Sequence, residues 1–135
     1  MTRIALVMHE PLGQAFASCA RHVFGGDPDL LVFDVAANAD PDERVDALVA
    51  ALRGGRQSEP VLILCDIFGA TPFNIANRAR KLVAERGVNV HLIAGSNLCM
   101  VLKALTERQD NPDQLAEKVR VGALRGVVDA DACGC

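Results

Sequence analysis

Aromatic residues are scarce in this chain of 135 residues, which contains no tryptophan, no tyrosine and five phenylalanines. Large aromatic rings are what proteins commonly stack against a flavin or a nucleobase. The sequence also lacks the GxGxxG pattern and the P-loop that are typical of nucleotide-binding domains. These absences argue against a carrier of flavin or nucleotide, and we expect no bound cofactor.

A surplus of positive charge and a long apolar run are missing as well. The formal net charge is -3 at pH 7, whereas nucleic-acid binders usually present a basic surface. No apolar run approaches the roughly 18 residues of a membrane-spanning helix. The first apolar segment is too short, and too soon followed by Glu10, to be a signal peptide. We therefore expect a cytoplasmic protein that binds no nucleic acid and does not insert into a membrane.

The five cysteines are an odd number, which does not indicate a disulfide framework. Three lie inside apolar segments, where cysteine behaves as a small hydrophobic residue: Cys19, Cys65 and Cys99. Cys133 and Cys135 form a single CxC without a second pair of ligands, which is a weak basis for a metal site. We expect no metal, one domain over residues 1–130 and a C-terminal tail over residues 131–135.

Four short apolar runs are typical of strands buried on both faces, and helical patterns separate them. The expected strands cover residues 4–8, 30–35, 61–65 and 88–94. The expected helices cover residues 11–24, 41–53, 72–86, 98–108 and 112–124. The alternation predicts an α/β three-layer sandwich, with a mostly parallel sheet in the order 2-1-3-4 and helices on both faces. Val127 and Val128 are expected to add a short C-terminal edge strand.

The stretch 61–74, VLILCDIFGATPFN, is the most informative part of the chain. Its apolar strand ends at Asp66, and a turn of small residues leads to Thr71 and Pro72. Thr71 suits a helix N-cap, and Pro72 suits the first helical position because its missing N–H costs nothing there. A strand that turns through glycine into a helix start favours anion binding, since free N–H groups and the positive dipole end point into the turn.

The predicted strand order reverses direction between strands 1 and 3, and ligands of such sheets bind beyond the carboxyl ends of the strands at that point. His9 follows strand 1 and Asp66 follows strand 3. We therefore expect both side chains in one crevice. An imidazole with one free nitrogen is a nucleophile, and a carboxylate on the other nitrogen fixes its tautomer. The pair predicts phosphoryl transfer through a phosphohistidine.

The turns beside this pair supply the remaining candidate site residues. The expected phosphate-binding residues are Gly69, Ala70, Thr71, Phe73 and Asn74. The expected partner-facing residues are Phe68, Ser96 and Asn97. The two asparagines and Ser96 equally suit side chains that only satisfy loop backbone groups. His22 and His91 do not lie at the carboxyl end of a strand, so we expect structural or surface roles for them.

Three segments together resemble the IIA domain of the mannose family of the bacterial sugar phosphotransferase system (PTS). They are His9-Glu10-Pro11-Leu12-Gly13, the DIFGATPFN block from Asp66 to Asn74, and Gly95-Ser96-Asn97-Leu98. The resemblance implies that the phosphocarrier HPr phosphorylates His9, that Asp66 orients this histidine, and that the group passes to a IIB protein. It also implies a homodimer in which the segment 126–130 pairs with the partner's sheet. Glu10 departs from the family's usual glycine, and Cys99 stands where proline is frequent.

Two other phosphotransfer systems share parts of this pattern. A two-component receiver domain would use Asp66 as phosphoacceptor with Mg²⁺, but it needs an acidic pair after strand 1 and a lysine after strand 5, which the sequence lacks. The phosphotransfer subunit of a dihydroxyacetone kinase has a similar fold and a phosphohistidine, so it stays an alternative. A regulatory protein that is switched by phosphorylation of His9 is the other alternative.

Overall fold

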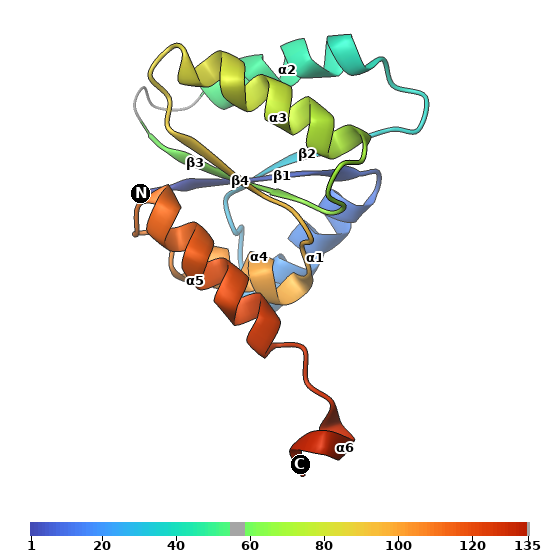
Figure 1. Ribbon diagram of the computed structural model, residues 1–135, viewed down its shortest axis with the longest axis vertical. Helices are drawn as coiled ribbons and strands as arrows, with labels where there is room; N and C mark the ends of the chain where they lie inside the picture. Colours follow the sequence, from blue (N-terminus) through green and yellow to red (C-terminus); the bar gives the residue numbers. More distant parts are fainter. Residues whose placement is uncertain (55–58, 135) are drawn as a thin grey trace.

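The computed structural model describes residues 1–54 and 59–134, and Figure 1 shows their arrangement in three layers. Residues 55–58, which follow the second predicted helix, and Cys135 of the predicted tail lie outside the described residues. The strands are β1 (Arg3–His9), β2 (Leu30–Val35), β3 (Val61–Cys65) and β4 (Val90–Ile93). They form one parallel sheet in the order β2-β1-β3-β4, which confirms the predicted order.

Helices cover both faces of this sheet, as predicted. The helices are α1 (Leu12–Phe24), α2 (Pro41–Arg53), α3 (Thr71–Ala84), α4 (Leu98–Thr106), α5 (Pro112–Arg125) and α6 (Ala130–Cys133). Figure 1 shows α2 and α3 on one face and α1, α4 and α5 on the other, while α6 lies away from the sheet. This arrangement leaves the loops at the carboxyl ends of the strands exposed along one edge.

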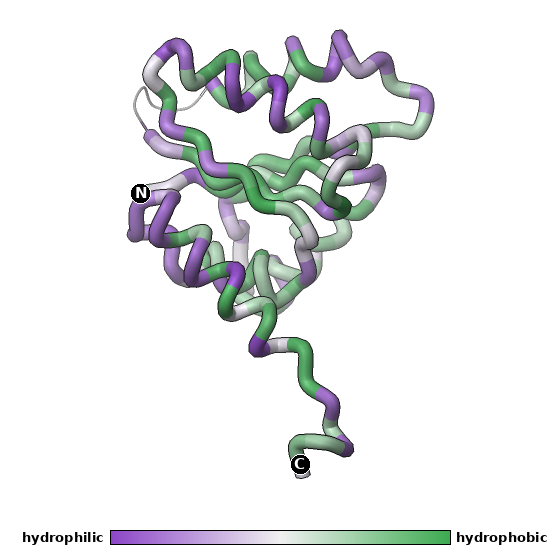
Figure 2. Tube along the Cα trace, viewed as in Figure 1, coloured by the Kyte–Doolittle hydropathy of each residue, from purple (hydrophilic) through white to green (hydrophobic). Residues whose placement is uncertain are grey.

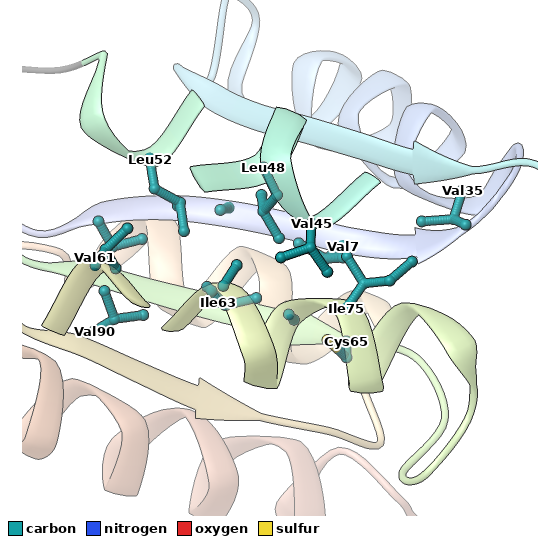
Figure 3. Packing of buried hydrophobic residues seen from close by; sticks show 14 residues of the cluster. Val7, Val35, Val45, Leu48, Leu52, Val61, Ile63, Cys65, Ile75 and Val90 are labelled. Atoms are coloured by element: carbon teal, nitrogen blue, oxygen red, sulfur yellow. The ribbon is translucent and has the colours of Figure 1, made fainter. Parts of the chain in front are cut away.

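The core consists of two apolar layers, because successive side chains of a strand point to opposite faces. In β1, Ala5 and Val7 pack toward α2 and α3, whereas Ile4, Leu6 and Met8 pack toward α4 and α5. Figure 3 shows the first of these layers, and Figure 2 shows the hydrophobic strands between helices with hydrophilic outer faces. The unbroken apolar runs of β1 and β3 follow directly from burial on both faces.

Capping residues start several helices where the sequence placed them. The side chains of Asp40 and Asn111 accept N-terminal N–H bonds of α2 and α5, and Asn97 does the same for α4. Gly25 ends α1 with φ of 76°, a conformation that glycine adopts without steric cost. Each cap satisfies a main-chain group that the helix itself leaves unpaired.

Two predicted helix starts are wrong by one residue. Thr71 is the first residue of α3 and Ala70 is its N-cap, because the N–H of Asn74 bonds the carbonyl of Ala70 and so begins the helical bonding one residue early. Pro11 is the N-cap of α1, whose N–H bonds begin with Ala15 donating to the Pro11 carbonyl. Neither cap residue makes a side-chain capping bond.

The predicted C-terminal edge strand does not form in the single chain. Val127 and Val128 follow the end of α5 without strand pairing, since the chain leads away from the sheet there (Figure 1). The tail predicted for residues 131–135 is helical in part. Asp129 accepts N–H bonds from Asp131 and Ala132 and thereby caps α6.

Candidate active site

His9 and Asp66 meet at the carboxyl edge of the sheet, between the two strands at which the strand order reverses. β1 and β3 pair in register from Arg3–Val61 to Val7–Cys65. β1 ends at His9 and Asp66 directly follows β3, so both residues lie at the same end of the paired strands. The Nδ1 atom of His9 lies 2.6 Å from Oδ2 of Asp66, and the main-chain N–H of His9 donates to the same oxygen at 3.0 Å. The structure thus brings together the two residues that sequence reasoning paired.

The two side chains differ sharply in exposure. The His9 side chain is 47% exposed, whereas that of Asp66 is 7% exposed. Burial by itself raises the pKa of the Asp66 carboxyl. This effect is outweighed by the hydrogen bonds that Asp66 accepts from the main chain and ring of His9 and from the main chain of Ile67, and by the charge of His9. The pKa of the Asp66 carboxyl therefore lies below its ordinary value. Asp66 is therefore a fixed carboxylate beneath an accessible imidazole.

This geometry determines which nitrogen of the ring is available. A carboxylate accepts only, so Nδ1 of His9 carries the proton and donates it to Asp66. Nε2 then keeps its lone pair, and no polar group among residues 1–54 and 59–134 bonds to it. An imidazole held in this tautomer is a nucleophile at Nε2, and the carboxylate stabilises the cation that forms when Nε2 is modified.

The N-terminus of α3 faces the same edge and leaves donors free. Within the described chain, the N–H groups of Gly69, Thr71 and Phe73 and the hydroxyl of Thr71 make no hydrogen bond. Free N–H groups at a helix start attract anions, because the helix dipole adds to their partial charge. These three residues are the members of the predicted phosphate-binding set whose main-chain N–H groups stay free for a ligand.

The other two members of that set have internal partners. The N–H of Ala70 donates to Ile67 at 3.3 Å, and the side-chain amide of Asn74 donates to the Gly69 carbonyl at 3.2 Å. Both bonds close the turn between β3 and α3. The protein's own hydrogen bonds thereby fix the main chain of this turn.

The N-terminus of α1, by contrast, is occupied by a carboxylate that sequence analysis did not single out. Asp34, the fifth residue of β2, accepts from the N–H groups of Gly13 at 2.8 Å and Gln14 at 3.1 Å. The signal in the sequence was an acid inside the apolar run LLVFDV. The sequence did not predict its role as a helix cap, because the N–H groups that it binds lie about twenty residues away in another element.

The turn after β4 holds the main chain at Asp66 from the side opposite His9. The hydroxyl of Ser96 donates to the Cys65 carbonyl at 2.6 Å, and the N–H of Ser96 donates to the same oxygen at 3.1 Å. The N–H of Gly95 donates to the Asp66 carbonyl at 3.0 Å. Asn97 caps α4 through Met100. The hydroxyl of Ser96 and the side-chain oxygen of Asn97, both predicted to face a partner, are thus engaged within the chain.

Phe68 is the predicted partner-facing residue that the structure leaves open. Its side chain is 78% exposed, and the neighbouring Ile67 is 59% exposed. The rings of Phe68 and Phe73 lie with centroids 4.9 Å apart. Apolar side chains exposed beside a reactive group are typical of a protein-docking surface.

Cys65, His91 and His22 do not join this site. Burial raises the pKa of the Cys65 thiol to about 12, with a smaller contribution from Asp66, so the thiol stays neutral at physiological pH. His91 pairs with Asp113 at 3.1 Å, away from the carboxyl ends of the strands, and His22 lies exposed in the last turn of α1. His9 is thus the one histidine held at the switch point.

A family model described as PTS system fructose IIA component matches residues 3–120. The chain belongs to this family of IIA components. It therefore has the role of a phosphotransferase component of the PTS. Among the described residues, no helix has the length and apolar character needed to cross a membrane.

Solved structures share this fold at low sequence identity. The EIIA component from Streptococcus agalactiae superposes with a TM-score of 0.85 at 24% identity, over 98% of this chain and 100% of that chain. The mannose/sorbose-specific IIA subunit from Enterococcus faecalis gives 0.81 at 23% identity, over 95% and 93%. The IIA protein associated with the fucose utilisation operon of Streptococcus pneumoniae gives 0.71 at 15% identity, over 100% of both chains.

Proposed function

We propose that His9 accepts a phosphoryl group from phosphorylated HPr and passes it to a IIB protein. The observation that carries this proposal is the 2.6 Å contact between Nδ1 of His9 and the buried carboxylate of Asp66. Nε2 attacks phosphorus, the new N–P bond forms as the bond to HPr breaks, and the proton on Nδ1 stays between the ring and Asp66. In the second transfer, the bond between Nε2 and phosphorus breaks as a new bond forms between phosphorus and the IIB protein.

The start of α3 supports the transferring group in this proposal. The phosphoryl oxygens carry negative charge, and the N–H groups of Gly69, Thr71 and Phe73 and the Thr71 hydroxyl are donors without protein partners in the described chain. Donors that are fixed before the reaction stabilise the developing charge without reorganising. Phe68, with Ile67 beside it, supplies an apolar contact for the incoming protein.

The proposal is tested by incubating the protein with enzyme I, HPr and phosphoenolpyruvate. We expect one phosphoryl group per chain, labile in acid and stable in alkali, as measured by intact-mass spectrometry. His9→Ala should abolish the modification, whereas the matched controls His22→Ala and His91→Ala should keep it. Modification that persists in His9→Ala would overturn the assignment.

A homodimer is the second part of the proposal. Val127 and Val128 are 75% and 61% exposed on a segment that leaves the domain, and β4 is an edge strand with one side unpaired in the described chain. An exposed edge pairs readily with an added strand, and a groove of about 260 Å³ beside Ile93 and Leu124 has room for apolar side chains. Light scattering should give twice the mass of the chain, and Val127→Asp should give a monomer. A wild-type monomer would contradict this part alone.

A further inference from the structure

Asp34 makes an unusual connection between a strand and a helix. Its two carboxylate oxygens accept separately from the N–H groups of Gly13, at 2.8 Å, and Gln14, at 3.1 Å. These are the second and third residues of α1, and the N-cap residue Pro11 offers no side-chain acceptor. A carboxylate at this position both satisfies unpaired N–H groups and opposes the positive end of the helix dipole.

The fit between Asp34 and α1 depends on glycine at position 13. A Cβ atom on Gly13 would lie 2.3 Å from Oδ1 of Asp34 and 3.0 Å from a methyl carbon of Val32. Real Cβ atoms do not approach other atoms that closely, so any larger residue would push the carboxylate away. The strand and the helix are therefore in direct contact where the carboxylate binds.

This contact bears on His9 because Gly13 lies only four positions after the histidine in the sequence. His9 pairs with Val35, the neighbour of Asp34, and the N–H of Glu10 donates to the Val35 carbonyl at 3.0 Å. The segment from His9 to Gln14 is thus bound to the end of β2 at both of its ends. Asp66 holds the imidazole from β3, on the other side of β1.

We propose that Asp34 is a positioning residue for His9, which fixes the segment 9–14 by binding the N-terminus of α1. The inference rests on the proposed role of His9 as phosphoacceptor. Asp34 makes no hydrogen bond to the imidazole, and its two bonds go to Gly13 and Gln14. Its removal frees the segment at one end, so that Nε2 of His9 is less often directed at the donor.

The test measures phosphorylation of His9 by two donors, phosphorylated HPr and the small molecule phosphoramidate, well below the melting temperature of every variant. Asp34→Ala should slow both reactions about tenfold, since small misplacements of reacting groups carry penalties of this order or more. With HPr, the loss should fall on the rate at saturating HPr and not on KM. Asp34→Asn keeps one acceptor oxygen and should restore part of the rate.

Asn111→Ala is the matched control. It removes a side-chain cap of the same kind from α5, at the other end of the sheet. We expect a fall in melting temperature similar to that of Asp34→Ala, with the wild-type rate. Asp34→Ala that reacts at the wild-type rate despite the same loss of stability would overturn the proposal.

A second variant displaces the carboxylate without removing it. Gly13→Ala should reproduce the rate loss of Asp34→Ala, and the double variant should be no slower than Asp34→Ala alone. Rate losses that multiply in the double variant would also overturn the proposal. Wild-type protein that reacts with phosphoramidate at His9 but not with phosphorylated HPr would refute the proposed donor. The phosphoramidate rates of the Asp34 variants would still test the role of Asp34.

Discussion

The molecule contains two histidine–aspartate pairs that differ in the length of the contact, in the burial of the carboxylate and in their place in the sheet. His9 and Asp66 lie 2.6 Å apart, and the carboxylate is 7% exposed. His91 and Asp113 lie 3.1 Å apart, and the carboxylate is 76% exposed. The first pair joins two central strands at the switch point, whereas the second joins the edge strand β4 to the first turn of α5.

The two pairs differ in how the carboxylate is held, beyond the distance between imidazole and carboxylate. Asp66 also accepts the main-chain N–H groups of His9 and Ile67, so its orientation is fixed before the ring binds. Asp113 accepts no main-chain N–H in the part of the chain that the structure describes, and it is exposed to solvent, where ion pairs contribute little. Preorganisation of the carboxylate distinguishes the two pairs.

The largest difference between the two pairs is expected in the rate of phosphoryl transfer when the charge of each carboxylate is removed in turn. Asp66→Asn cannot accept at both positions, because its NH2 group must face either Ile67 or the two donors of His9. We expect phosphoryl transfer from HPr to fall at least about 10²-fold, as for other orienting carboxylates. Single-turnover kinetics of His9 phosphorylation measure this loss.

Asp113→Asn is the matched control for that experiment. It changes the charge of the solvated pair, which lies on another part of the sheet, and should leave the transfer rate unchanged within a factor of about two, since exposed pairs are worth at most about 1 kcal/mol. Equal effects of the two substitutions would mean that net charge, and not orientation of His9, controls the rate.

The second-largest effect is expected in the pH dependence of stability, to which the Asp66 carboxylate contributes. Because its folded-state pKa lies below the ordinary value of about 3.9, the carboxylate stabilises the fold above that pH, and the contribution is lost as pH falls through the lower folded-state pKa. We expect the wild type to exceed Asp66→Asn in urea midpoint at pH 6 and the gap to narrow below about pH 4. A gap that widens in acid would contradict the direction of the shift.

A smaller effect is expected from Ser96, which holds the main chain behind Asp66. Ser96→Ala removes the 2.6 Å bond to the Cys65 carbonyl but leaves the N–H of residue 96 as a second donor. The loss of one such bond costs about 1 kcal/mol, so we expect a lower urea midpoint and a transfer rate reduced a few-fold. Ser96→Thr, which keeps the hydroxyl, should recover both. A rate loss as large as that of Asp66→Asn would show a direct role for Ser96.

The parts of the site that were predictable depend on local patterns and on topology. Apolar runs located the four strands, and their alternation with helices led to the order that places His9 beside Asp66. Helix caps at Asp40 and Asn111 were predictable because the capping side chain and its partners are neighbours in sequence. Thr71 was placed one residue wrong, since the start of a helix depends on which carbonyl accepts the first bond.

The sequence by itself determined the sheet, its layers and the meeting of an imidazole with a carboxylate. The hydrophobic pattern identifies the strands and helices, and their alternation along the chain leads to the strand order. Only the tertiary structure decided which helix start stays free for an anion: Asp34 fills that of α1, while α3 keeps its donors. It also decided that Ser96 turns inward to support Asp66. These contacts join elements that are distant in sequence, and they depend on distances of a few ångströms that no local pattern encodes.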